Sequence, residues 1–117
     1  MKELFTLKGS RFRYKGDLSE EIIVYPSDKN DKHQDKCALV ITPYTIKMIL
    51  KAIKEMKEIP MGASRDNPPK NSLGYLLIKD DQTPQQLSYI IPIFIHSGLC
   101  TYRKEGNAFI IKYKGEI

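Results

Sequence analysis

The chain of 117 residues contains few cysteines and no long apolar run. Its two thiols, Cys37 and Cys100, are too few for a disulfide framework or for the four ligands of a typical structural zinc site. We expect both to be reduced, and the alternative of one bridge between them stays open. No run of about 18 apolar residues occurs, so we expect no membrane-spanning helix. The first residues lack the pattern of a signal peptide, which predicts a cytoplasmic protein.

The residue patterns of common catalytic and metal sites are also missing. The two histidines, His33 and His96, stand outside any metal-ligand spacing, and neither cysteine belongs to a C-x-x-C pair. Asp28, Asp31 and Asp35 lack the glycine and the final glutamate of a calcium-binding loop. We therefore expect a protein that is not an enzyme and that uses no metal or cofactor.

What the sequence does contain is an excess of positive charge. The 19 lysines and arginines against 14 aspartates and glutamates give a net charge of +5, which favours an anionic partner. Many soluble proteins with other functions are equally basic, so the charge alone identifies no partner. The hydrophobic content of 41% and the charged content of 28% are typical of a globular protein, and the length is enough for one domain.

Residues 1–41 have the pattern of a β-rich segment. Apolar and polar residues alternate up to Tyr14, and Glu21–Tyr25 contains a β-branched run. Residues 26–36 are almost entirely polar, so we expect them to form an exposed loop. The segment either extends a sheet, covers the rest of the chain, or provides the interface of a homodimer or of a complex with another protein.

Aromatic and basic residues lie close together in this segment. Phe12, Tyr14 and Tyr25 occur near Arg11 and Arg13 in the sequence. One interpretation is a stacking platform for single-stranded nucleic acid. The other is that these aromatic side chains are partly buried strand residues without a binding role.

Two matching helix starts follow this segment. Thr42-Pro43 and Thr83-Pro84 each place a threonine N-cap before a proline at the first helical position. Apolar residues then recur with the helical period. The predicted elements are a helix over 43–57, a short extended stretch over 59–63, a short helix over 73–79 capped by Asn71 or Ser72, a helix over 84–97, and two strands, 99–104 and 107–113, joined at Glu105-Gly106.

This order of helix, short strand, short helix, helix and β-hairpin resembles the winged helix-turn-helix superfamily over about residues 42–113. The resemblance implies an α+β fold in which a winged-helix domain over 42–117 is preceded by the β-rich segment 1–41. In this superfamily the third helix usually enters the major groove of DNA, and the hairpin, called the wing, contacts phosphate or the minor groove. The resemblance thus implies a protein that binds duplex DNA without catalysis, as a small transcription regulator or a DNA-targeting component.

With this fold, the candidate DNA contacts come from three places. They are Gln85, Gln86, Ser88 and Tyr89 on the third helix, Arg103, Lys104 and Asn107 around the hairpin tip, and Arg65 and Lys70 in the preceding loop. Gln and Ser side chains can bond to base edges, and cations bind phosphate. Each group also has a structural alternative: a polar residue beside an apolar helix face, a cation that protects a strand edge, or, for Gln86, an amide engaged in a capping box.

Pro92 conflicts with an uninterrupted third helix. A proline inside a helix costs about 3 kcal/mol, so we expect a kink near Ser88–Pro92 or a complete break. We place Pro92 on the outer face of the helix, where water can reach the backbone carbonyl that loses its donor. A complete break would weaken the interpretation of this helix as the one that contacts DNA.

An alternative function on the same fold is a protein-interaction or assembly module, with the β-rich segment as its interface. Binding to nucleic acid weakens steeply with salt, whereas a protein complex can be insensitive to it. The role of the loop from Gly62 to Lys70 stays open, because Arg65 either binds phosphate or forms a structural latch with Asp66. A third class, a small enzyme with its site on this loop, would need a deep pocket lined by Arg65, Asp66 and a histidine.

Overall fold

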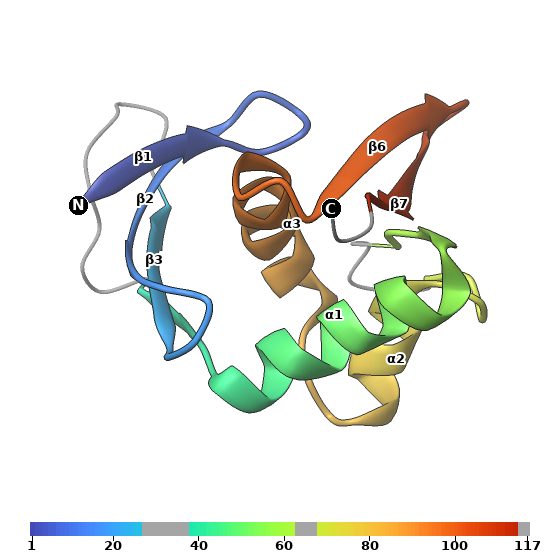
Figure 1. Cartoon of the computed structure of the whole chain (residues 1–117), viewed down its shortest axis with the longest axis horizontal. Helices are drawn as coiled ribbons and strands as arrows, with labels where there is room; N and C mark the ends of the chain where they lie inside the picture. Colours follow the sequence, from blue (N-terminus) through green and yellow to red (C-terminus); the bar gives the residue numbers. More distant parts are fainter. Residues whose placement is uncertain (27–37, 63–67, 115–117) are drawn as a thin grey trace.

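The structure is a computed structural model, and it describes residues 1–26, 38–62 and 68–114 (Figure 1). Within these ranges the chain forms three α-helices and two antiparallel sheets, which confirms the α+β class. In chain order the elements are β1 (Lys2–Phe5), β2 (Arg11–Gly16), β3 (Ile22–Pro26), β4 (Leu39–Ile41), α1 (Pro43–Met56), β5 (Glu58–Pro60), α2 (Leu73–Lys79), the 3-10 turn η2 (Pro84–Gln86), α3 (Leu87–His96), β6 (Cys100–Glu105) and β7 (Ala108–Tyr113). Cys37 and residues 27–36 of the predicted exposed loop lie outside the described residues.

The N-terminal sheet has four strands in the order β1-β2-β3-β4. Phe12 and Tyr14 on β2 lie opposite Pro26 and Val24 on β3. Both aromatic side chains are buried, because alternate residues of a strand point to the same face and this face packs on the core. Phe12 and Tyr14 therefore cannot form the stacking platform that was one interpretation of the sequence.

The C-terminal sheet has three strands in the order β5-β7-β6, so that β7 is the central strand. β6 and β7 form the predicted hairpin, paired from Cys100 with Tyr113 to Glu105 with Ala108. β5 pairs with the other edge of β7. The order of elements from α1 onward agrees with the order predicted from the sequence.

The predicted helix starts are confirmed at α1 and α2. The hydroxyl of Thr42 accepts a hydrogen bond of 3.2 Å from the backbone N–H of Thr45, and the hydroxyl of Ser72 accepts one of 3.2 Å from that of Tyr75. The cap at Thr83 leads into η2, and the α-helical part of the predicted third helix begins only at Leu87.

Helix α3 lies in the interior of the molecule, between the N-terminal sheet and the other elements (Figure 1). It runs through Pro92 without a break, and the proline itself is buried. Our placement of Pro92 on an outer, hydrated face is therefore wrong. The reason is that the N-terminal sheet covers this side of the helix, where the rings of Phe12 and Tyr89 meet edge to face with centroids 5.2 Å apart.

The two parts of the chain that the sequence distinguished share one hydrophobic core. Phe12 and Val24 of the N-terminal sheet belong to the same buried cluster as Ile46 and Ile53 of α1 and Phe94 of α3. The N-terminal segment is thus packed directly on the elements that follow it. None of the described helices is both long and apolar enough to span a membrane.

Candidate functional site

A cleft of about 690 Å³ opens between the turn that joins β1 to β2, the start of α3, and the tip of the β6–β7 hairpin. Four of the contacts predicted from the sequence line it, namely Gln85, Ser88, Tyr89 and Asn107. The structure therefore brings part of the predicted third helix and part of the predicted hairpin tip to one site.

The β1–β2 turn forms the wall of the cleft that sequence reasoning missed. Thr6, Leu7 and Lys8 line the cleft, and they are distant in sequence from the other lining residues, which fall between Pro60 and Phe109. The turn is held internally, since the Thr6 hydroxyl accepts a hydrogen bond of 3.0 Å from the Ser10 N–H and the Thr6 carbonyl accepts one of 2.9 Å from the Gly9 N–H. Lys8 is therefore presented at the cleft by a defined turn. No local signal in residues 6–8 indicates this role.

Tyr89 contributes a half-buried side chain to the cleft. Its ring packs against Phe12, and partial burial raises the pKa of its phenol above the ordinary value of 10.0. The phenol is therefore protonated at neutral pH and available as a hydrogen-bond donor. Gln85 and Asn107 are exposed, and each adds an amide that can both donate and accept hydrogen bonds.

Gln86, the neighbour of Gln85, turns inward instead. It is 5% exposed, and its Nε2 donates hydrogen bonds to Gln82 Oε1 at 3.2 Å and to the Thr83 carbonyl at 3.3 Å. Gln82 Oε1 also accepts a hydrogen bond of 2.5 Å from the Thr45 hydroxyl. The prediction that Gln86 faces a DNA groove is therefore wrong. Its amide connects η2 to the start of α1 through the side chain of Gln82.

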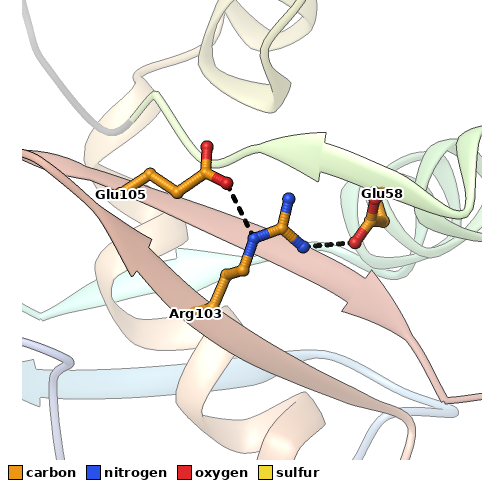
Figure 2. Close-up of polar contacts among 3 residues, drawn as sticks. All are labelled: Glu58, Arg103 and Glu105. Atoms are coloured by element: carbon orange, nitrogen blue, oxygen red, sulfur yellow. Dashed lines mark hydrogen bonds and ion pairs between the residues drawn. The ribbon is translucent and has the colours of Figure 1, made fainter.

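Arg103 lies on the outer face of the hairpin sheet, held by two carboxylates (Figure 2). Its Nε donates to Glu105 Oε1 at 2.9 Å, and its Nη1 pairs with Glu58. The hydrogen bonds to Glu58 and Glu105 raise the pKa of the guanidinium above its usual value. The cation that we predicted as a phosphate contact thus already has two anionic partners.

Two of the other predicted cations, Lys104 and Lys70, lie at different places around the cleft. The ammonium of Lys104 is 5.9 Å from the ring centroid of Phe109, which lines the cleft. Lys70 is exposed and follows Pro69, another lining residue. Arg65 lies outside the described residues, so the structure assigns it no place.

Two glycines bring the end of β5 against the start of α2 and so shape one wall of the cleft. A Cβ on Gly74 would lie 1.7 Å from the carbonyl oxygen of Gly62, and a Cβ on Gly62 would lie 2.3 Å from the hydroxyl oxygen of Ser72. The Gly74 N–H also donates a hydrogen bond of 2.9 Å to the Met61 carbonyl. Only residues without a side chain allow this contact, which positions Met61 and Gly62 at the cleft.

The nucleophile and metal-ligand groups of the described chain do not converge on the cleft. Cys100 is buried, and burial raises the pKa of its thiol to about 11, so the thiol is protonated at neutral pH. Within residues 1–26, 38–62 and 68–114, no group of three or more His, Cys, Asp or Glu side chains could hold a metal ion. What the cleft offers is apolar surface with a few amide, hydroxyl and charged groups, which is the composition of a binding site.

Comparison of the chain with protein-family models, with curated proteins and with solved structures finds no match. The cleft and the surfaces of the molecule are therefore the basis for assigning a function.

Proposed function

We propose that this chain is a non-enzymatic interaction module with a winged-helix arrangement, and that it binds a segment of a partner protein in the cleft between the β1–β2 turn and the β6–β7 hairpin. The arrangement is supported by the succession α1–β5–α2–α3–β6–β7 and by the position of β7 between β5 and β6. This is the order on which the resemblance to winged helices rests.

We choose a protein partner because the N-terminal sheet packs over α3. A helix that reads a major groove presents side chains along an exposed face. Here Pro92 is buried and Tyr89 packs on Phe12, so the N-terminal sheet occupies the place of a duplex where Phe12 covers Tyr89. Gln85, just before the helix, and Ser88 and Tyr89 in its first turn are the residues that reach the cleft.

The chemistry of the cleft also suits a peptide. Leu7, Pro60 and Phe109 supply apolar contacts, and the amides of Gln85 and Asn107 can bond to the N–H and C=O groups of an extended backbone. The volume of about 690 Å³ falls within the roughly 300–1,000 Å³ of sites that enclose small ligands. A few side chains of a partner segment would fill it.

Selection from a phage-displayed library of random peptides tests this proposal. We expect enriched peptides to bind the natural chain and to lose at least about tenfold in affinity to the Ser88→Arg variant, because an arginine at this position fills the cleft. The Lys47→Arg variant, altered on the exposed side of α1, is the control and should bind normally. The proposal fails if no peptide is enriched, or if the selected peptides bind the Ser88→Arg variant as well as the natural chain.

Duplex DNA is the second candidate partner, favoured by the cations beside the cleft. Lys8 lines the cleft, Lys70 follows a lining residue, and Lys104 lies over the lining ring of Phe109. Cations in these positions fit contacts to phosphate, which give affinity without sequence information. In this arrangement the β1–β2 turn and the hairpin tip would approach the DNA backbone, without a helix deep in the groove.

Fluorescence anisotropy with a mixed-sequence duplex, from low to physiological salt, tests the second candidate. We expect the Lys8→Ala/Lys104→Ala variant to bind more weakly and with a salt slope smaller by about 1.8, since each lost phosphate contact removes about 0.9. The Lys47→Ala/Lys51→Ala variant removes the same charge from α1 and should retain the natural slope. Equal losses in the two variants would contradict a DNA site at the cleft.

A further inference from the structure

The outer face of the N-terminal sheet carries a second set of residues with binding chemistry, away from the core. The strand register places Phe5 opposite Arg11 and Arg13 opposite Tyr25, and these four residues alternate with buried neighbours such as Phe12. Side chains at opposed positions in neighbouring strands share a face. The four residues therefore lie together on the face that points away from α3.

The two aromatic side chains of this face stand on either side of a strand that carries the two arginines. Phe5 is 58% exposed, which is unusual for a phenylalanine on a sheet that has a buried face. Tyr25 is half-buried, with the ammonium of Lys15 at 5.9 Å from its ring centroid. Neighbouring strands lie about 4.8 Å apart, so the strand with the arginines separates β1 from β3 by about 10 Å in all.

Among the described residues, the strands of this face carry more positive than negative charge. Glu3 is a carboxylate beside the arginines among the described residues, with Oε2 at 3.5 Å from Arg13 Nε and Oε1 at 4.0 Å from Arg11 Nη1. Lys15 adds a third cation on the same strand, so the described strands β1 to β3 carry Glu3 as their acidic residue beside these three cations. The acidic residues of the β2–β3 turn, among them Asp17, come after Lys15 and so lie at the end of β2 remote from Arg11.

We infer that this face binds single-stranded nucleic acid, with bases stacked on Phe5 and Tyr25 and phosphates held by Arg11 and Arg13. Aromatic rings interleaved with cations on an exposed surface are what single strands need, because unpaired bases present their π-faces and the backbone presents a regular negative charge. A duplex keeps its base faces inside its own stack, so it gains little from an exposed ring. The inference does not depend on the cleft or on its ligand.

Anisotropy of a fluorescein-labelled oligothymidylate of about twelve nucleotides tests the inference. We expect the Phe5→Ala variant to bind about tenfold more weakly through the loss of stacking. Arg13→Gln should reduce the salt slope by about 0.7, the value for one phosphate contact of a single strand. Glu3→Gln removes a competing carboxylate and should tighten binding. A duplex of equal length and heparin, a polyanion without bases, should both bind more weakly than the oligothymidylate.

Two variants on α1 serve as matched controls. Tyr44 is a similarly exposed aromatic residue, at 60%, and Lys47 is an exposed cation. Tyr44→Ala and Lys47→Gln should bind the oligothymidylate as the natural chain does. Circular dichroism should show that each variant is folded, as expected for substitutions of exposed side chains.

Several results would overturn the inference. One is the absence of oligothymidylate binding at low salt. Another is equal binding of heparin and oligothymidylate that Phe5→Ala leaves unchanged, since the surface would then act by charge alone. A third is a natural chain that forms a dimer in light scattering and becomes monomeric on Phe5→Ala without binding the oligothymidylate, because the face would then bind a second copy of the chain.

Discussion

Arg103 on β6 reaches over the central strand β7 and pairs with Glu58 on β5, so one side-chain contact spans the whole three-stranded sheet (Figure 2). Glu105, two residues along the same strand, holds the other side of the guanidinium. A cation with two carboxylate partners attracts a phosphate less strongly than an unpaired cation in the same position near the hairpin tip would. The sequence showed the arginine, and the structure shows what it is paired with.

The first prediction concerns this arrangement. Arg103→Ala/Glu58→Gln should leave the affinity for duplex DNA at low salt within about twofold of the natural value, because it removes the guanidinium together with one of its two carboxylates and so keeps the net charge of the cluster. Glu58→Gln/Glu105→Gln should increase the affinity by exposing an unopposed cation. Anisotropy titrations measure both. A large loss of affinity on Arg103→Ala/Glu58→Gln would show that the guanidinium leaves its carboxylates to contact DNA.

The second prediction separates two adjacent glutamines. Gln86→Ala should lower the free energy of unfolding by about 1–2 kcal/mol, because it removes a buried amide that bonds to Gln82 and to the Thr83 carbonyl. Gln85→Ala should change it by less than about 0.5 kcal/mol, since Gln85 is exposed. Urea denaturation followed by circular dichroism measures both values. The reverse order of effects would contradict the structural role of Gln86.

The third prediction tests the contact between β5 and α2. Gly74→Ala should destabilise the fold by about 3 kcal/mol or more, because the added Cβ meets the backbone oxygen of Gly62 and neither backbone can move without disturbing the core. Gly98→Ala is the control: its backbone has φ of +80° but open space around it, so it should cost about 1–2 kcal/mol from strain alone. Equal midpoints of urea denaturation for the two variants would show that the contact between Gly62 and Gly74 leaves room for a Cβ atom.

The fourth prediction is a pH dependence from Cys100. Burial raises the pKa of this thiol from 9.0 to about 11, so the unfolded chain releases the proton at a lower pH than the folded chain does. The stability that Cys100 contributes is therefore complete below about pH 9 and declines as the pH rises towards 11. Urea denaturation at several pH values should show this decline, and the Cys100→Ala variant should lack that part of it.

Reactivity of the same thiol offers an independent check. In a Cys37→Ser background, Cys100 is the sole cysteine of the chain. It should react with a thiol reagent at about pH 8 far more slowly in the folded protein than in urea, because the thiolate is scarce and the side chain is covered. Rapid labelling of the folded protein would contradict both the burial and the raised pKa.

Local signals account for most of what the sequence predicted correctly. The caps at Thr42 and Ser72 and the hairpin between β6 and β7 depend on neighbouring residues, and each is present in the structure. The error at α3 came from a contact between distant segments, since Phe12 packs on Tyr89 and closes the face that was expected to be open. The composition of the helix does contain a warning, because its residues are apolar on nearly every side and such helices are buried.

In the candidate site, too, local sequence signals identified some of the residues, and contacts between distant segments supplied the rest. Gln85, Ser88, Tyr89 and Asn107 were predicted as contacts and do line one cleft. Thr6, Leu7 and Lys8 were not, because nothing in their own sequence says which distant elements they will meet. The periodicity of apolar residues predicts which side of a helix or strand is buried. It does not predict which other part of the chain will pack against that side.

The cleft is assembled from residues near the start of the chain, from its middle and from near its end, so it exists only when the whole fold exists. Any ligand of the cleft therefore binds the folded state alone and raises the melting temperature, by an amount equivalent to about 2.7 kcal/mol at one hundred times its dissociation constant. A thermal-shift screen would thus find cleft ligands whatever their chemical class. Loss of the shift in the Ser88→Arg variant would assign each hit to this site.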